Sequence, residues 1–278
     1  MHLQYMFAAQ YWIRGNYVHL YRNNTWIFSP VSTLLGKITM SELLTIVFLT
    51  AGAGACIPLG AIIASVEKIR SSWLEKEFRH FVIAFGGGIL LGAVSVVLVP
   101  EGISSMGNSI FSIPIVLVGA IFFFVIERFL GLRRRESPQL MGMVLDYIPE
   151  AIALGGLVAV GSSIAPMLAL LIGLQNLPEG FNAYRELKSQ RRGSTKQTLL
   201  VMSLLVPLGP AAGICGYVFL SGHEAILGAV MLFSSGGIIY LIFQDIAPQS
   251  RLKKHWAPPI GAVFGFCLAL FSKMLVNA

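Results

Sequence analysis

Four proline-containing segments place acidic or amide side chains inside apolar stretches of the sequence or at their ends. They are Val99-Pro100-Glu101-Gly102, Asp146-Tyr147-Ile148-Pro149-Glu150, Gln175-Asn176-Leu177-Pro178-Glu179 and Gln244-Asp245-Ile246-Ala247-Pro248. In the second segment the two carboxyl groups stand four residues apart, a spacing that puts them on one face of a helix. The third segment repeats this spacing with Gln175 and Glu179. Carboxylate and amide oxygens in this pattern suit a hard cation.

The prolines and the apolar surroundings strengthen this interpretation. Pro149 and Pro178 each remove one helical hydrogen bond, which frees a carbonyl beside the carboxylates. A charged side chain in the middle of a bilayer costs at least about 2.5–3.5 kcal/mol, and no Lys or Arg lies at this depth to offset it. The cluster therefore needs protons or a bound cation. The alternative is that the carboxyl groups stay protonated and only join neighbouring helices.

Composition determines the class of protein. The chain has 278 residues, 55% of them hydrophobic and 12% charged, whereas soluble globular proteins carry about 25% charged residues. This excludes a soluble domain and a disordered chain, and it indicates an integral membrane protein with the lipid bilayer as partner. The net charge of +7 fits cytoplasmic loops rather than nucleic acid. The three cysteines lack the spacing of a metal site.

Eight apolar stretches are each close to the length that a bilayer demands, so we expect an all-α polytopic membrane protein with eight transmembrane helices. They are Leu43–Val66, Phe81–Pro100, Ile110–Ile126, Leu140–Val160, Ile164–Phe181, Leu199–Leu220, Ala225–Ile246 and Pro258–Val276. The first, third, fifth and seventh loops hold 16 of the 20 Lys and Arg residues, and the loops between them hold none. This alternation predicts cytoplasmic odd-numbered loops and both termini outside.

The two central segments are expected at the same depth in the membrane. Asp146 and Glu150 are expected roughly 9–15 Å from the cytoplasmic end of their span, and Gln175 and Glu179 roughly 16–22 Å from the outer end of theirs. In a hydrocarbon core about 30 Å thick these positions share one layer. Glu101 lies at an outer end and is a candidate entrance. Asp245 lies near an inner end and is a candidate exit or second site. The alternative for each of the two is an ordinary interfacial carboxylate.

The sequence divides into an N-terminal segment, residues 1–40, and an expected eight-helix transmembrane domain, residues 41–278. The first segment is aromatic and mixed, and its apolar runs are too short to span a membrane. One hypothesis is that Met40 is the true start and the preceding residues are artefactual. The other is an interfacial aromatic segment on the extracytoplasmic side.

From roughly Ser41 to Ala278 these features resemble the ZIP family of divalent-metal transporters, which has eight spans, both ends outside and Pro-Glu motifs in the fourth and fifth spans. The resemblance implies a binuclear site between those two spans, completed by the second and seventh. It implies no cofactor, because the metal is the transported substrate, and it leaves a homodimer open. The residues it assigns to the metal site are Asp146, Glu150, Gln175, Asn176, Glu179 and Asp245, with Glu101 as an entrance.

Several positions depart from the family pattern. Asp146 takes the place of the usual His, Tyr147 that of the usual Asn, Leu90 that of a frequent Met, and Asp245 stands where Glu is common. All five histidines lie outside the two central segments: His2, His19, His80, His223 and His255. The donor set is therefore mostly oxygen, which favours harder ions such as Mn²⁺ or Mg²⁺ over Zn²⁺. A second metal position is left open.

We expect a carrier that moves divalent cations of the Zn, Mn and Fe class toward the cytoplasm, in the plasma (inner) membrane if the source is prokaryotic. Gly88 and Pro100 have the same separation as Gly236 and Pro248, a weak sign of an inverted repeat. The sequence contains no P-loop, Gly-x-Gly-Asp or HExxH motif, so no motif in it indicates an enzyme. The alternatives are a proton-coupled transporter of small solutes and a metal-binding membrane protein that transports nothing.

Overall fold

A computed structural model describes residues 11–14, 17–22, 25–30, 38–67, 72–130, 138–190, 194–252 and 256–277. The chain forms two compact units, Met1–Leu44 and Thr45–Ala278. The first contains an antiparallel sheet of β1 (Tyr11–Arg14), β2 (Tyr17–Arg22) and β3 (Thr25–Pro30) in the order β1-β2-β3. The sequence did not predict this sheet. Helix α2 begins at Met40, and the hypothesis that the chain itself starts there stays a prediction.

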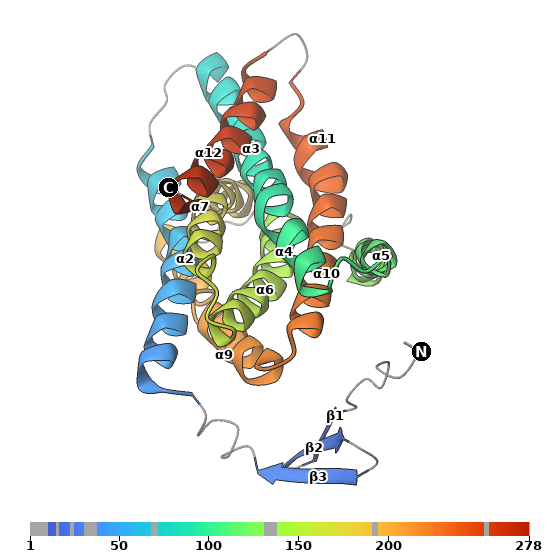
Figure 1. Ribbon diagram of the computed structural model, residues 1–278. Coiled ribbons are helices and arrows are strands. Elements are labelled where there is room, and N and C mark those ends of the chain that lie inside the picture. Colours follow the sequence, from blue (N-terminus) through green and yellow to red (C-terminus); the bar gives the residue numbers. More distant parts are fainter. Residues whose placement is uncertain are drawn as a thin grey trace. The chain divides into compact units, whose positions relative to one another are not determined.

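The described part of the second unit is entirely helical (Figure 1). Its elements are α2 (Met40–Val66), α3 (Ser72–Ala93), η1 (Val94–Leu98), α4 (Val99–Ser105), α5 (Ser112–Leu130), α6 (Pro138–Ala159), α7 (Ala165–Gln190), α8 (Thr195–Ser203), α9 (Leu208–Leu220), α10 (Glu224–Leu241), η3 (Ile242–Ile246), α11 (Ala247–Ser250) and α12 (Ala257–Asn277). The helical class predicted for this unit is confirmed.

Within the described residues, seven helical segments are long and apolar enough to cross a membrane, as expected for an integral multi-pass protein. They are Met40–Val66, Lys76–Ser105, Ser112–Phe129, Gln139–Ala159, Thr195–Leu220, Glu224–Ser250 and Ala257–Val276. The predicted eighth span, Ile164–Phe181, lies in α7. That helix has 26 residues, but its polar side chains make it less apolar than the other seven.

Two continuous helical arms are built alike. The first arm is α3–η1–α4 and the second arm is α10–η3–α11. In each, a π-helical turn precedes a proline: the Val99 N–H donates to Val94 O in the first, and the Ala247 N–H to Ile242 O in the second. The wider turn accommodates a proline ring that would collide with the carbonyl four residues before it.

Each arm also crosses one outer helix at very short range, α12 for the first and α5 for the second. A Cβ atom on Gly88 would stand 2.0 Å from the Ala262 carbonyl oxygen, and one on Gly236 would stand 1.9 Å from that of Val116. Only glycine permits these approaches, which is how small residues bring membrane helices together. Figure 1 shows α3 and α12 side by side.

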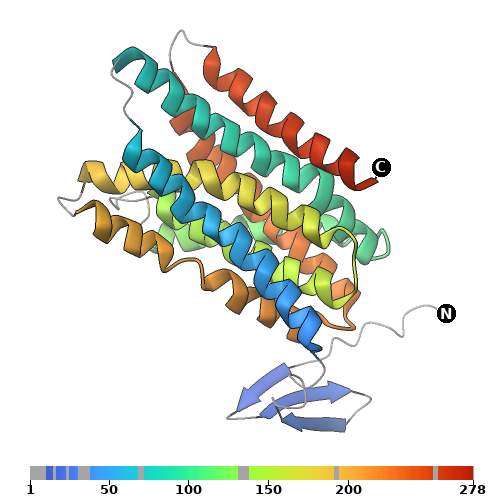
Figure 2. The ribbon, with the colours of Figure 1, turned by 90° about the vertical axis from the view of Figure 1, so that its left-hand side faces the viewer.

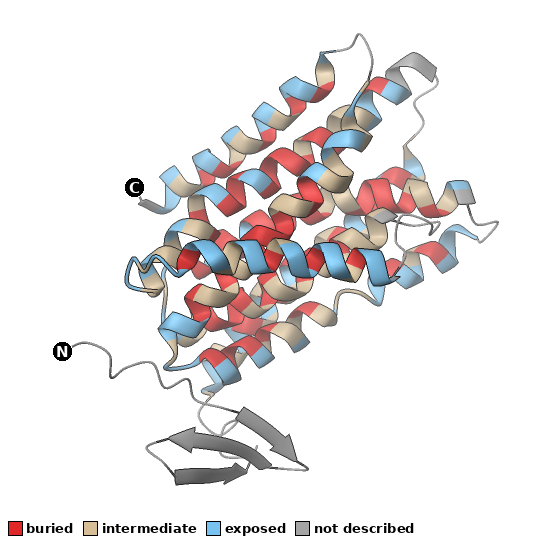
Figure 3. Cartoon of the chain, turned by 90° about the vertical axis from the view of Figure 1, so that its right-hand side faces the viewer, coloured by how far each residue is buried: buried red, intermediate tan, exposed pale blue. Residues whose placement is uncertain are grey.

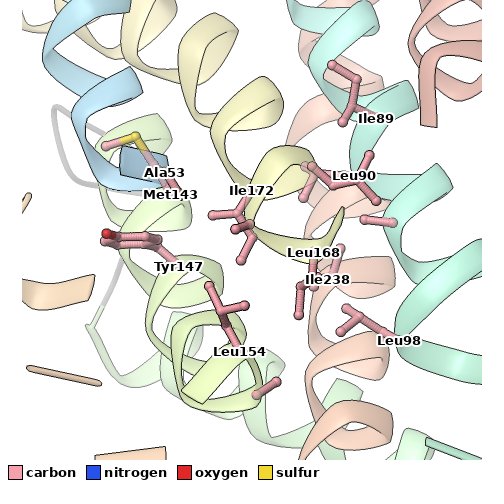
Figure 4. Close-up of a cluster of buried hydrophobic side chains, with 14 of the residues drawn as sticks. Ala53, Ile89, Leu90, Leu98, Met143, Tyr147, Leu154, Leu168, Ile172 and Ile238 are labelled. Carbon is pink, nitrogen blue, oxygen red and sulfur yellow. The ribbon is translucent and has the colours of Figure 1, made fainter. Parts of the chain in front are cut away.

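Burial separates interior helices from peripheral ones. Within the most apolar stretch of each span, 67% of the first-arm residues and 61% of the second-arm residues are buried, against 22% in α5 and α12. Figure 3 shows this contrast, with the largely exposed α5 nearest the viewer. Helices α6 and α7 belong to the interior, and Leu154, Leu168 and Ile172 from them are fully buried in the core (Figure 4).

Candidate functional site

Helices α6 and α7 pack against each other and bring the two central polar segments together. The Gln175 side-chain amide donates a hydrogen bond of 2.6 Å from Nε2 to Glu150 Oε2. Glu150 and Gln175 are completely buried, and Asn176 is 1% and Asp146 3% exposed. Glu179 lies on the same helix as Gln175 and is half-buried. The two segments therefore meet in one protected layer of the bundle.

Helix α2 fixes the orientation of part of this layer. It runs along α7 (Figure 2), where Gly60 and Gly180 allow close approach. The Asn176 side chain donates from Nδ2 to the carbonyl of Ala53 at 3.0 Å, which turns its Oδ1 oxygen away from that bond. An amide held by its nitrogen presents a defined acceptor.

Tyr147 is directed away from the acidic cluster. Its hydroxyl donates to the backbone carbonyl of Thr50 on α2 at 3.0 Å. A Cβ on Gly54 would stand 2.2 Å from this hydroxyl oxygen and one on Gly209 only 1.9 Å, so the two glycines make room for the phenol. The Tyr147 side chain therefore joins α6 to α2.

Seven buried side-chain oxygen atoms of α6 and α7 accept no hydrogen bond from any described residue. They are Gln139 Oε1, Asp146 Oδ1, Glu150 Oε1, Gln175 Oε1, Asn176 Oδ1, Glu179 Oε2 and Asn182 Oδ1. A buried acceptor without a donor costs about 1–3 kcal/mol, so a bound group that supplies a partner stabilises this region. All seven are hard oxygen donors of the kind that divalent cations such as Mn²⁺ take. Sequence reasoning missed Asn182, although it follows Glu179 by three residues on the same helix.

A pocket lies beside the N-terminal part of α6 and the C-terminal half of α7. Its cavity measures about 50 Å³, and it is lined by Val82, Ile83, Gly86, Gly87, Gln139, Gly142, Met143, Asp146, Pro178, Glu179, Asn182, Leu241, Asp245, Ile246 and Gln249. Asp245 thus shares a pocket with Asp146 and Glu179. Glu150, Gln175 and Asn176 do not line it. All four predicted contributors, the two arms, α6 and α7, meet at this pocket.

A hydrogen-bonded chain joins Glu186, Gln139 and Gln249, and the last two of these line the pocket. The Gln139 backbone N–H donates to Glu186 Oε2 at 3.0 Å, and the Gln139 side chain donates from Nε2 to Gln249 Oε1 at 2.6 Å. Burial raises the pKa of Glu186, which lies beyond the cytoplasmic end of its predicted span, to about 7. Its bond from Gln139 and the nearby Arg79 oppose this shift in pKa, whereas Asp245 adds to it.

The remaining candidates lie elsewhere. Glu101 is half-buried on α4 and is not part of the pocket lining. Of the histidines, His80 contacts the Lys76 carbonyl and His223 that of Ser221, while the side chains of His2, His19 and His255 lie outside the described residues. The described residues hold no group of three His, Cys, Asp or Glu side chains arranged for a metal. Any cation here therefore relies on amide oxygens as well as carboxylates.

No model of a known protein family matches the chain, and a search of curated proteins finds no match.

Proposed function

We propose that the chain transports divalent metal cations across a membrane, toward the cytoplasm, through the site formed by Asp146, Glu150, Gln175, Asn176, Glu179 and Asp245. One observation carries the proposal: seven buried side-chain oxygen atoms of α6 and α7 accept no hydrogen bond from any described residue. A dehydrated cation bound among them would supply the partner that its neighbouring oxygens lack. The resemblance to the ZIP family, noted in the sequence, points to the same function and adds Glu101 as the entrance.

A cation accounts for this cluster better than protonation does. Four of the seven oxygens belong to the amides Gln139, Gln175, Asn176 and Asn182, and an amide oxygen takes up no proton at neutral pH. Protonation neutralises the carboxylates but leaves the amides in need of a donor. Divalent hard cations take six or more oxygen ligands, including neutral ones.

The size of the pocket favours an ion over an organic solute. Its cavity of about 50 Å³ is far smaller than the roughly 300–1,000 Å³ of sites that hold small organic molecules. A metal ion with one or two of its waters needs much less room. The alternative of a solute transporter therefore has no observation that favours it.

Helix α7 supplies the eighth span in this proposal. Its 26 residues extend over about 39 Å, enough to cross the hydrocarbon core. It is less apolar than the other spans because it faces α2, α3 and α6 and carries half of the site. With eight spans the odd-numbered loops are cytoplasmic, so the pocket opens toward the cytoplasm.

The test is uptake of Mn²⁺, Fe²⁺, Zn²⁺, Co²⁺ and Cd²⁺ into proteoliposomes. Glu150→Gln and Glu179→Gln keep the side-chain volume and remove one ligand charge, and each is expected to lower uptake at least about tenfold. Glu224→Gln removes an exposed charge from the start of α10 and is the matched control. Wild-type uptake by both site variants would overturn the ligand assignment. Metal binding without flux would instead identify a protein that binds metal but does not transport it.

A further inference from the structure

The peripheral helix α5 buries an acidic residue while its apolar neighbours are exposed. Glu127 is 3% exposed, whereas Phe124 is 46% and Phe129 86% exposed. Glutamate is almost never fully buried unless it is paired. Because Glu127 is not part of the pocket lining, its burial calls for an explanation outside the candidate metal site.

Glu127 belongs to the seam along which α5 crosses the second arm. The described buried residues of α5 are Ser112, Gly119, Phe123 and Glu127. Their spacing of seven, four and four residues puts them on one helix face. A Cβ on Gly119 would stand 2.0 Å from the Phe233 carbonyl oxygen, and one on Gly237 would stand 2.4 Å from the Phe123 ring. Glu127 therefore occupies the next position of a tightly packed seam, where an apolar side chain is the ordinary choice.

The carboxyl group of Glu127 joins α5 to both sides of the junction between α10 and η3. The hydroxyl of Tyr240, on α10, donates a hydrogen bond to Oε2. The side chain of Gln244, in the π-helical turn, donates from Nε2 to Oε1 at 3.4 Å. Neither donor lines the pocket. Because one planar group holds a residue before the turn and a residue within it, it fixes the rotation of the turn relative to α10.

The equivalent crossing of the first arm ends differently. Helices α3 and α12 approach as closely, since a Cβ on Gly265 would stand 2.1 Å from the Phe85 carbonyl oxygen. The last buried residue of the α12 seam is Ser272, and its hydroxyl donates to the Leu268 carbonyl of its own helix at 2.9 Å. Among the described residues, a carboxyl group bonded across a crossing is thus found on the arm that carries Asp245.

The direction of Asp245 follows from that of Gln244. The two residues are consecutive in η3, so their side chains leave the turn on different sides. With Gln244 held on α5, Asp245 lines the pocket. Release of Gln244 would let the turn rotate and would move Asp245 with it.

We propose that Glu127 is a positioning residue for transport: by holding α10 and η3 against α5, it keeps Asp245 directed into the pocket. This inference rests on the proposed transport function. The role depends on hydrogen bonding and not on charge. An amide in the same place accepts from Tyr240 and donates to Gln244, whose own amide oxygen is then the acceptor. A residue that bound the metal or carried a proton would instead need the carboxyl group.

The experiment measures how Mn²⁺ uptake into proteoliposomes depends on Mn²⁺ concentration. Glu127→Gln keeps both bonds and is expected to leave KM close to that of the wild type. Glu127→Leu removes both acceptors and is expected to raise KM at least about tenfold, the usual cost of losing a group that orients a metal ligand. Gln244→Leu removes only the bond to the turn and is expected to raise KM as well, which keeps the test decisive if Glu127→Leu does not fold. Ser272→Ala, at the end of the α12 seam, is the matched control with unchanged KM.

A double-mutant comparison separates positioning from a merely structural role. In an Asp245→Val background, Glu127→Leu is expected to have no further effect on KM, because it acts through Asp245. A structural role would lower uptake to the same extent in both backgrounds.

The outcomes distinguish this inference from the function on which it rests. Wild-type KM in Glu127→Leu and Gln244→Leu would overturn the positioning role and leave the transport function intact. A loss in Glu127→Gln as large as that in Glu127→Leu, or equal effects of Glu127→Leu with and without Asp245→Val, would overturn it too. A wild-type protein that transports none of the five metals would refute the transport function itself.

Discussion

The first and second arms share a backbone and differ in chemistry. Each has a glycine against a carbonyl of its partner helix, then a π-helical turn, then a proline at the same interval. Val97 occupies in η1 the place that Asp245 has in η3. Val97 is fully buried in the apolar core, whereas Asp245 is half-buried and lines the pocket.

The same arrangement of π-helical turn and proline therefore occurs in two regions of the bundle that differ in polarity. Around η1 the core is closed by side chains such as Leu98, Leu168 and Ile238, which gather between the first arm, α7 and the second arm (Figure 4). Around η3 the corresponding region holds Asp245 and Gln249 and opens into the pocket. The π-turn and the proline determine the path of the backbone. The side chains on the turn determine whether the region around it is apolar, as at η1, or polar, as at η3.

The largest expected effect comes from giving the first arm the side chain of the second. Val97→Asp places a carboxyl group at a position with no exposed surface, which costs about 2.5–3.5 kcal/mol or more in an apolar, lipid-enclosed interior. We expect a large fall in the thermal melting temperature in detergent. Asp245→Val makes the reverse change in the half-buried pocket and is expected to melt close to wild type. A Val97→Asp protein of wild-type stability would mean that water reaches this end as well.

A smaller effect is expected at the two helix crossings. Gly88→Ala and Gly236→Ala put a methyl group about where a backbone carbonyl oxygen stands, at 2.0 and 1.9 Å, so the helices must separate. Overpacking of this kind costs roughly 1–3 kcal/mol. Because the two crossings are equivalent, the two variants should lose similar unfolding free energy. Gly52→Ala, where a Cβ meets nothing within 4 Å, is the neutral control, and unequal losses would break the equivalence of the arms.

Much of the bundle could be predicted because apolar length and charge alternation are local properties of the sequence. Six of the eight predicted spans correspond to one long apolar helix each, and the span Leu199–Leu220 runs through α8 and α9. The span in α7 is different, because the residues that form the site make it too polar to stand out by apolarity. The sheet of residues 11–30 was missed because its strands are short and are defined by their pairing with one another.

The candidate site could be predicted only in part, because only some of its residues stand in a recognisable sequence pattern. The spacing of Asp146 with Glu150 and of Gln175 with Glu179 predicted their shared faces, and the structure brings the two faces together. Asn182 and Gln139 gave no comparable signal, because neutral amides are common and only burial without a donor distinguishes them. The direction of the Tyr147 hydroxyl depends on Thr50 and on two distant glycines, which no local pattern relates.

The smallest effect sharpens the comparison most. Pro100→Ala and Pro248→Ala restore a backbone N–H and remove the ring that requires a wider turn, so each π-turn can relax into regular helix. Little stability should be lost, within about 1 kcal/mol. Relaxation of η3 turns Asp245 within the pocket, so Pro248→Ala should weaken Mn²⁺ binding about threefold, or roughly 0.6 kcal/mol. Relaxation of η1 moves only apolar side chains, so Pro100→Ala should leave binding unchanged. If both substitutions changed Mn²⁺ affinity equally, metal binding would depend on both arms to the same extent. The distinction between an apolar region at η1 and a polar region at η3 would then be wrong.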